Sequence, residues 1–187
     1  MKKEFKYFVV NKPFGVLSQF TDHSGRETLA SLFSFSKGVY PVGRLDYDSE
    51  GLLLLTNDKT LTDKLLHPIQ KLEKEYLVQV EGVPTEEALL HLSAGVVIEN
   101  KKTLPAKVKI LQDQSPFEER IPPVRFRKTI PTTWLSITII EGRNRQVRKM
   151  TAGVGFPTLR LVRIRIGKIQ LGSLRLGEVK EIRASSF

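Results

Sequence analysis

The stretch Gly43-Arg44-Leu45-Asp46-Tyr47-Asp48-Ser49-Glu50-Gly51 is a polar loop that runs directly into the apolar segment Leu52-Leu53-Leu54-Leu55-Thr56. A continuous apolar run of this length, bounded by a glycine, is typical of a buried strand. The loop places one carboxylate, Asp46, between an arginine and a second acid, which suggests that Asp46 has a catalytic role in addition to a structural one. An ordinary turn, with Asp and Gly in their usual positions, is the alternative, and the loop alone favours that alternative.

Outward from this loop, alternating and amphipathic segments predict strands and helices that intermix without regular βαβ units. We expect strands at residues 5–10, 38–42, 52–56, 74–81, 96–99, 106–112 and 134–141, a returning segment at 16–20, and a hairpin over 159–171 that turns near Gly167. We expect helices from the cap Thr28 to residue 33, from Asn57 or Asp58 to 67, over 86–93 with Pro84 at a first helical position, and over 144–154. The pattern predicts an α+β fold with a central mixed or mostly antiparallel sheet.

Composition limits the classes of function. The 187 residues include 30 Lys plus Arg against 20 Asp plus Glu, a formal charge of +10, which attracts polyanions such as nucleic acid. A solvated basic surface is an equal alternative from charge alone. Without cysteine, disulfides, thiolate nucleophiles and Cys-ligated metals are excluded. The three histidines, His23, His67 and His91, do not stand at ligand spacing with other ligands, so no metal is predicted.

The N-terminal apolar run is short and is broken by Asn11, Lys12 and Pro13. It is too short for a signal sequence or a membrane span, so a cytoplasmic protein without a membrane partner is expected. No linker or internal repeat divides the chain, which favours a single domain, and without a coiled-coil pattern a monomer is the default.

Two further segments are candidates for binding. Residues 141–150, Glu141-Gly142-Arg143-Asn144-Arg145-Gln146-Val147-Arg148-Lys149-Met150, place four cations at an expected helix start, where the helix dipole disfavours positive charge. A phosphate or a buried carboxylate would compensate, although a solvated basic turn is also compatible. The proline-rich residues 115–131 lack periodicity and indicate a basic loop. Tyr76, at the start of an expected strand, taken alone is most often a packing residue.

Taken together, Lys12-Pro13-Phe14-Gly15, the loop at 43–53, Lys74-Glu75-Tyr76 and residues 141–150 resemble the ordered motifs of one family. They are similar to those of the bacterial pseudouridine synthase family that is named after type A of the small-subunit enzymes and also holds several large-subunit enzymes. The likeness covers nearly the whole chain and implies one pseudouridine synthase catalytic domain over residues 1–187. Because the Lys-Pro turn already starts at residue 12, no N-terminal RNA-binding module of the S4 type is expected.

The resemblance implies a catalytic cleft across the sheet and an isomerase that converts a uridine to pseudouridine without metal or cofactor. It assigns the nucleophile to Asp46, whose carboxylate would attack the sugar or the base or stabilise the departing fragment. Arg148 is implied to pair with this carboxylate and keep it charged. Tyr76 is implied to pack on the target base, and either stacking alone or proton transfer suits its phenol.

The implied partner is 23S ribosomal RNA, with a single-stranded or stem-loop target, and not DNA. Since a stacked uridine hides its C1′ and C5 atoms, the nucleotide is expected to flip out, with Arg44 entering the vacated stack. Candidate phosphate contacts are Lys12, Arg125, Arg127, Lys128, Arg143, Arg145 and Lys149. Two other hypotheses are a non-catalytic RNA-binding or ribosome-assembly protein, and a DNA-binding domain, for which no known DNA-binding motif is recognisable.

Overall fold

The computed structural model describes residues 4–112, 117–125, 127 and 129–187, and of Pro68 it describes the backbone alone. The chain forms two compact units. Unit 1 contains residues up to Leu72 together with residues from Arg163 to the C-terminus, and unit 2 contains Glu73–Val162. Each unit is therefore described by itself.

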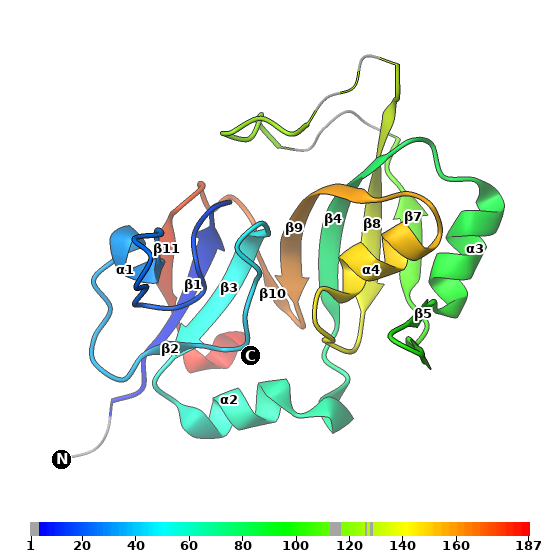
Figure 1. Cartoon of the computed structure of the whole chain (residues 1–187). Helices are drawn as coiled ribbons and strands as arrows, with labels where there is room; N and C mark the ends of the chain where they lie inside the picture. The colour runs from blue at the N-terminus through cyan, green and yellow to red at the C-terminus, as the bar shows by residue number, and fades with distance from the viewer. Residues whose placement is uncertain (1–3, 113–116, 126, 128) are drawn as a thin grey trace. The chain divides into compact units, whose positions relative to one another are not determined.

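Unit 1 is built on strands from both ends of the chain, which appear side by side in blue, cyan and red in Figure 1. The central strand β1 pairs antiparallel with β3 on one side and with β11 on the other. The short strand β2 pairs antiparallel with β3, and β10 pairs antiparallel with β9. The strands are β1 (Tyr7–Lys12), β2 (Tyr40–Pro41), β3 (Glu50–Thr56), β10 (Ile169–Gln170) and β11 (Val179–Ile182), and β9 (Thr158–Ile166) contributes its last four residues.

The apolar segment after the polar loop is a buried strand, as predicted. Every residue of β3 is buried, and the four leucines of residues 52–55 are at most 1% exposed. Both helices of unit 1 begin at the predicted caps: Thr28 Oγ1 accepts from Ala30 N at the start of α1 (Leu29–Leu32), and Asp58 Oδ1 accepts from Leu61 N at the start of α2 (Lys59–Leu66). A 3₁₀ turn (Pro68–Gln70) follows α2, and a second one (Ala184–Ser186) ends the unit.

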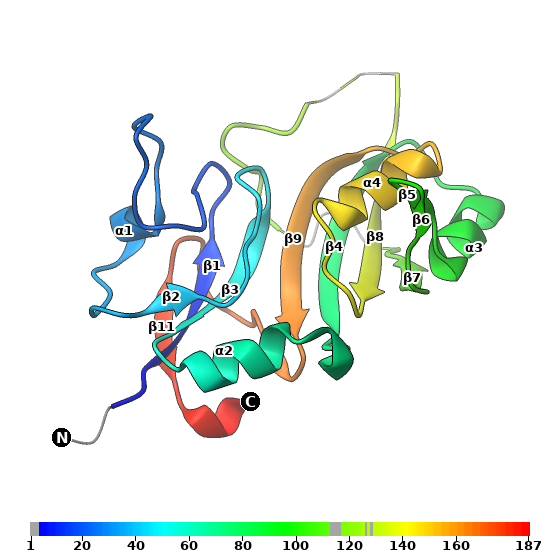
Figure 2. The ribbon, with the colours of Figure 1, turned by 60° about the horizontal axis from the view of Figure 1, so that its bottom comes forward.

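Unit 2 contains a sheet in the order β9, β4, β8, β7, to which β9 contributes residues 158–162. Strands β4 (Lys74–Glu81), β8 (Thr132–Ile139) and β7 (Lys107–Ile110) pair antiparallel, and β5 (Val97–Ile98) and β6 (Lys101–Lys102) form a separate small hairpin. In β4 the buried side chains are Tyr76, Val78 and Val80, which is the alternation that the sequence predicts. Figures 1 and 2 show α3 at the β7 edge of this sheet.

The helices of unit 2 are α3 (Glu86–Ala94) and α4 (Gln146–Gly153). The cap of α3 is Thr85, whose hydroxyl accepts from Ala88 N, so the expectation of Pro84 at a first helical position is wrong by two residues. Helix α4 starts after Arg145, which adopts a left-handed conformation with φ of 50°. No helix within the described residues is both long and apolar enough to cross a membrane.

The α+β class is confirmed, one further local expectation is wrong, and two strands were not predicted. Residues 16–20 form only an isolated bridge between Leu17 and Thr28. The sequence did not predict β6 or β11.

Candidate functional site

The loop that carries Asp46 is anchored in the core of unit 1 by the residue before it. Leu45 is buried, and both of its backbone groups bond to Ser18: the Ser18 hydroxyl donates to Leu45 O at 2.8 Å and accepts from Leu45 N at 3.1 Å. Ser49 N donates to Asp46 O at 3.1 Å, which closes a turn that starts at Asp46. The half-buried carboxylate of Asp46 is thereby carried on a fixed backbone, with Arg44 exposed beside it.

A second turn supports this loop. Gly15 N donates to Tyr47 O at 2.9 Å, and the rings of Phe14 and Tyr47 pack at 6.3 Å between centroids. The turn is closed by Lys12, whose Nζ donates to Pro13 O at 2.8 Å and to Val16 O at 2.7 Å. Lys12 is completely buried. In this arrangement its ammonium group holds the turn, which argues against the predicted phosphate contact by Lys12.

Burial lowers the pKa of Lys12 from 10.5 to about 8. The carboxylates of Glu50, Asp48 and Asp46 act against this effect by favouring the charged ammonium, and Arg163 adds to it by repulsion. The interaction with these carboxylates places the buried cation within electrostatic reach of the loop that carries Asp46. The sequence reasoning missed this arrangement, because lysine is almost never fully buried.

The second residue of β3 is a glycine, Gly51, for a steric reason. A Cβ atom at Gly51 would lie 2.3 Å from Arg163 O and 2.7 Å from Arg163 N, and Gly51 has φ of 101°. The side chain of Arg163 is also buried and donates from Nε to Leu52 O at 2.8 Å. Close backbone packing of β9 on the end of the loop therefore requires glycine at this position.

The other two predicted catalytic residues, Tyr76 and Arg148, both belong to unit 2. Tyr76 is the third residue of β4. It is buried, with 8% of the residue exposed, and it pairs with Ile137 of β8. Arg148 lies on the first turns of α4, half-buried, and its NH1 group donates to Thr158 O at 3.4 Å. Each is thus held by a regular element of its own unit, as a positioned side chain requires.

Arg143 has an internal role that the sequence did not reveal. Its guanidinium donates to Ile98 O at 2.6 Å and to Lys101 O at 3.0 Å, so it ties the β5–β6 hairpin to the segment before α4. On the same segment, Gln146 Oε1 accepts from Arg143 N, and Gln146 Nε2 donates to Glu141 Oε1 at 2.6 Å. These bonds hold the segment before α4 in place. They also occupy N–H donors of the Arg143 guanidinium, which leaves fewer donors for the predicted phosphate contact.

The remaining predicted phosphate contacts divide into two groups. Lys149 Nζ bonds to Glu99, and Arg127 NH1 lies 2.9 Å from Glu81 Oε1. Both pairs are partly exposed, and a phosphate would have to replace the carboxylate in order to bind either cation. Arg125 and Arg145 are exposed. Lys128 lies outside the described residues.

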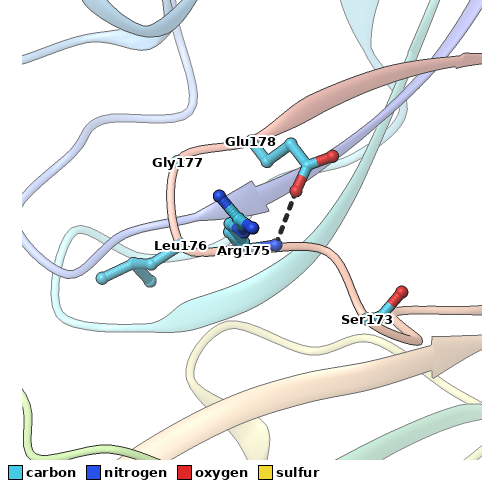
Figure 3. A pocket seen from close by; sticks show the side chains of 5 residues that line it. All are labelled: Ser173, Arg175, Leu176, Gly177 and Glu178. Atoms are coloured by element: carbon cyan, nitrogen blue, oxygen red, sulfur yellow. Dashed lines mark hydrogen bonds between the residues drawn. The ribbon is translucent and has the colours of Figure 1, made fainter.

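A shallow hollow in unit 1 lies on the loop between β10 and β11 (Figure 3). Arg175 N donates to Glu178 Oε2 at 2.8 Å across its floor. Asn11 fixes this loop, since its Nδ2 donates to Leu174 O and its backbone bonds to Gly177 N and Glu178 O. No predicted site residue lines this hollow, and we assign it no ligand.

Three further residues of the loop's surroundings were missed: Ser18, Glu50 and Arg163 are all buried and polar. Arg163 is one of three arginines within residues 159–166, so the sequence does not distinguish it from its neighbours. Ser18 leaves no sequence signal either, because its bonds to Leu45 span 27 residues.

Comparison with known proteins identifies relatives of the whole chain. The model of the family described as RNA pseudouridylate synthase matches residues 6–153. Ribosomal large subunit pseudouridine synthase E of Vibrio vulnificus is 58% identical over 98% of this chain and 77% of its own length. The protein of the same name from Xanthomonas axonopodis pv. citri is 53% identical over 85% of this chain and 84% of its own length.

A crystal structure of a pseudouridylate synthase matches 97% of the chain and 72% of its own, with a TM-score of 0.81 and 30% identity. Residues 122–128, 130–135 and 151–161 themselves resemble the E type of the large-subunit enzymes, and relatives of that name are found. The family name taken from type A of the small-subunit enzymes is not supported by these matches. The chain belongs to the RNA pseudouridylate synthase family.

Proposed function

We propose that this protein isomerises a specific uridine to pseudouridine in the 23S RNA of the large ribosomal subunit. The observation that carries the proposal is identity of 53–58% to relatives named ribosomal large subunit pseudouridine synthase E, over most of both chains. The formal charge of +10 supports a polyanionic substrate. The proposal includes a flipped-out target nucleotide and a monomeric, cytoplasmic enzyme that needs no DNA, membrane or cofactor.

In the proposed reaction the bond between N1 and C1′ of the uridine breaks, the base rotates, and C5 bonds to C1′. The proton leaves C5 and N1 gains one, so the product is an isomer of the substrate. Asp46 is the proposed nucleophile or electrostatic partner for the separated fragments. Its fixed backbone supports this role, because a nucleophile gains rate from being held in position.

The other roles follow the same proposal. Arg148 is the cation that keeps the nucleophile ionised, and Tyr76 packs against the target base. Tyr76→Phe, which keeps the ring and removes the hydroxyl, separates packing from proton transfer. Arg44 is exposed, as a side chain that enters a base stack must be.

The test uses the purified protein and an unmodified transcript of 23S RNA, without added metal or cofactor, and maps pseudouridine at nucleotide resolution. We expect conversion at a defined uridine by the wild-type protein and none by Asp46→Asn, with RNA binding retained within a few-fold. Asp48→Asn is the comparison on the same loop, because it also removes one carboxylate. An equal loss in both variants would assign the effect to the loop rather than to a nucleophile.

The alternative function, a non-catalytic RNA-binding or ribosome-assembly protein, makes the opposite prediction. The pseudouridine map of total RNA from a deletion strain would then match that of the parent strain. A single missing pseudouridine in large-subunit RNA, restored by the wild-type gene but not by Asp46→Asn, excludes this alternative.

A further inference from the structure

A short segment of unit 1 connects the loop that carries Asp46 to a second loop, residues 22–26. At one end of this segment, Gly15 N donates to Tyr47 O at 2.9 Å. At the other end, Leu17 N donates to Glu27 O at 2.8 Å, and Leu17 forms a bridge with Thr28. The two loops are therefore attached to neighbouring points of the same strand-like segment, and they border the same part of unit 1.

The second loop is organised around one carboxylate. Asp22 Oδ2 accepts from Ser24 N and Arg26 N, both at 3.0 Å, and from Arg26 Nε at 3.2 Å, while Oδ1 accepts from Arg26 NH2 at 2.7 Å. These bonds hold the pKa of Asp22 well below its usual range, with the Arg26 side chain as the largest cause. The carboxylate side chain is 5% exposed, whereas that of Arg26 is 48% exposed.

This pairing fixes one edge of the Arg26 guanidinium and leaves the rest of it in solvent. A guanidinium has five N–H donors, and Asp22 takes two of them. The others have no partner within the described part of the chain. A cation that is oriented in advance in this way loses less entropy when it binds an anion.

Next to this loop, Tyr47 presents an aromatic face directly after Asp46 in sequence. Tyr47 is 42% exposed although its backbone is bonded to Gly15 and its ring packs on Phe14. The phenol also lies over the turn, with its oxygen 3.7 Å from the Cβ position of Gly15. The pKa of Arg26 is raised mainly by Asp22 and to a smaller extent by the phenol of Tyr47, so the two side chains are within electrostatic reach.

We propose that Tyr47 and Arg26 form a subsite for a nucleotide that neighbours the target uridine, with its base stacked on the Tyr47 ring and its phosphate bound by the Arg26 guanidinium. The subsite rests on the proposed function, because an RNA substrate at Asp46 supplies the neighbouring nucleotide. An exposed aromatic ring within electrostatic reach of an oriented cation is a combination that binds single-stranded RNA without reading its sequence. Asp22 is a positioning residue in this subsite.

The test measures binding of an unmodified transcript that contains the converted 23S segment, over a series of KCl concentrations. Tyr47→Ala is expected to weaken binding at least about 5-fold, since stacking of one base contributes a factor of this size or more. Tyr47→Phe keeps the ring and stays within about twofold. Arg26→Gln lowers the log-log salt slope by about 0.7, the loss of one phosphate contact, whereas Asp22→Asn weakens binding and leaves the slope unchanged.

Matched controls are Tyr40→Ala and Arg183→Gln, which alter an exposed tyrosine beside the last residue of β3 and an exposed arginine just after β11. Both are expected to bind as the wild-type protein does. Thermal unfolding by circular dichroism confirms that each variant is folded.

A double-mutant cycle locates the base. Single abasic nucleotides are placed at each position flanking the target, and binding is compared for the wild-type protein and Tyr47→Ala. At one position the abasic change is expected to weaken wild-type binding and to have little further effect in the variant. Conversion of the uridine by the wild-type protein tests the proposed function separately. Conversion together with additive effects at every position overturns the subsite and leaves the function intact.

Discussion

The buried ammonium of Lys12 makes the stability of the protein depend on pH in a way that can be measured. Its pKa is about 8 in the folded protein against 10.5 for an ordinary lysine, and burial is the main cause. Between these two values the unfolded chain binds more protons at this residue than the folded protein does. Stability therefore rises with pH from about 8 to about 10.5, which is opposite in sign to the effect of a lysine stabilised by an ion pair.

The magnitude follows from the two pKa values. A pKa lower by about 2.5 corresponds to a cost of about 3 kcal/mol for keeping Lys12 charged in the folded protein at neutral pH. From pH 7 to pH 10 about 2.5 kcal/mol of this cost disappears as the folded state releases the proton. The turn survives this change, since a neutral amine keeps two N–H groups for Pro13 O and Val16 O.

The assay compares the wild-type protein with Lys12→Met, which has a similar volume and no titrating group. Free energies of unfolding are measured by urea denaturation and circular dichroism at pH 7 and pH 10, and the difference between the two proteins cancels the titration of all other groups. We expect this difference to shift by about 2.5 kcal/mol in favour of the wild-type protein. Parallel pH profiles, or a lysine resonance that titrates near 10.5 by NMR, would refute the reasoning.

Three further outcomes are expected. Gly51→Ala lowers the free energy of unfolding by more than about 3 kcal/mol or prevents folding, because the new Cβ would meet Arg163 backbone atoms and the φ of Gly51 is positive. The control is Gly142→Ala, whose new Cβ would have no atom within 4 Å, and its free energy of unfolding stays within about 0.5 kcal/mol of the wild-type value. Arg143→Lys lowers stability by about 1–2 kcal/mol in urea unfolding, since one ammonium cannot replace both bonds to the β5–β6 hairpin; an unchanged midpoint would remove Arg143 from this role. The plot of log binding constant against log salt concentration for RNA has a slope near −2 rather than −4, because several predicted phosphate contacts are engaged within the protein. About three exposed arginines then contribute about −0.7 each. A slope of −4 or steeper would show that the internal pairs open on binding.

The elements that the sequence predicts well are those with a strong local signal. The alternation of residues 74–81 gives the bounds of β4, and the side chains of Thr28 and Asp58 cap the helices that they were expected to cap. Strand β11 has no such signal, because its middle residues are charged and exposed and it is held by backbone pairing with β1, some 170 residues away in sequence. Pairing between distant segments is set by the fold as a whole, and local periodicity does not report it.

The same distinction applies to the candidate site. The motif at residues 43–51 predicts which carboxylate is presented, and the structure places Asp46 on a fixed turn. It does not predict what holds the turn, since Lys12 and Arg143 look like surface cations in the sequence and are instead committed to backbone carbonyl groups. Counting basic residues therefore overestimates the surface that can bind phosphate.

The burial of cations around the loop has a physical logic. A loop that must present a carboxylate to solvent cannot be anchored through that side chain, so its backbone has to be held from the other side. Leu45 supplies an apolar anchor, Ser18 satisfies both of its backbone groups, and Lys12 closes the supporting turn through two backbone carbonyl groups. Because Ser18 and Lys12 hold the loop and its supporting turn through main-chain atoms, substitutions at Asp46 and Tyr47 are expected to test chemistry or binding with little disturbance of the fold.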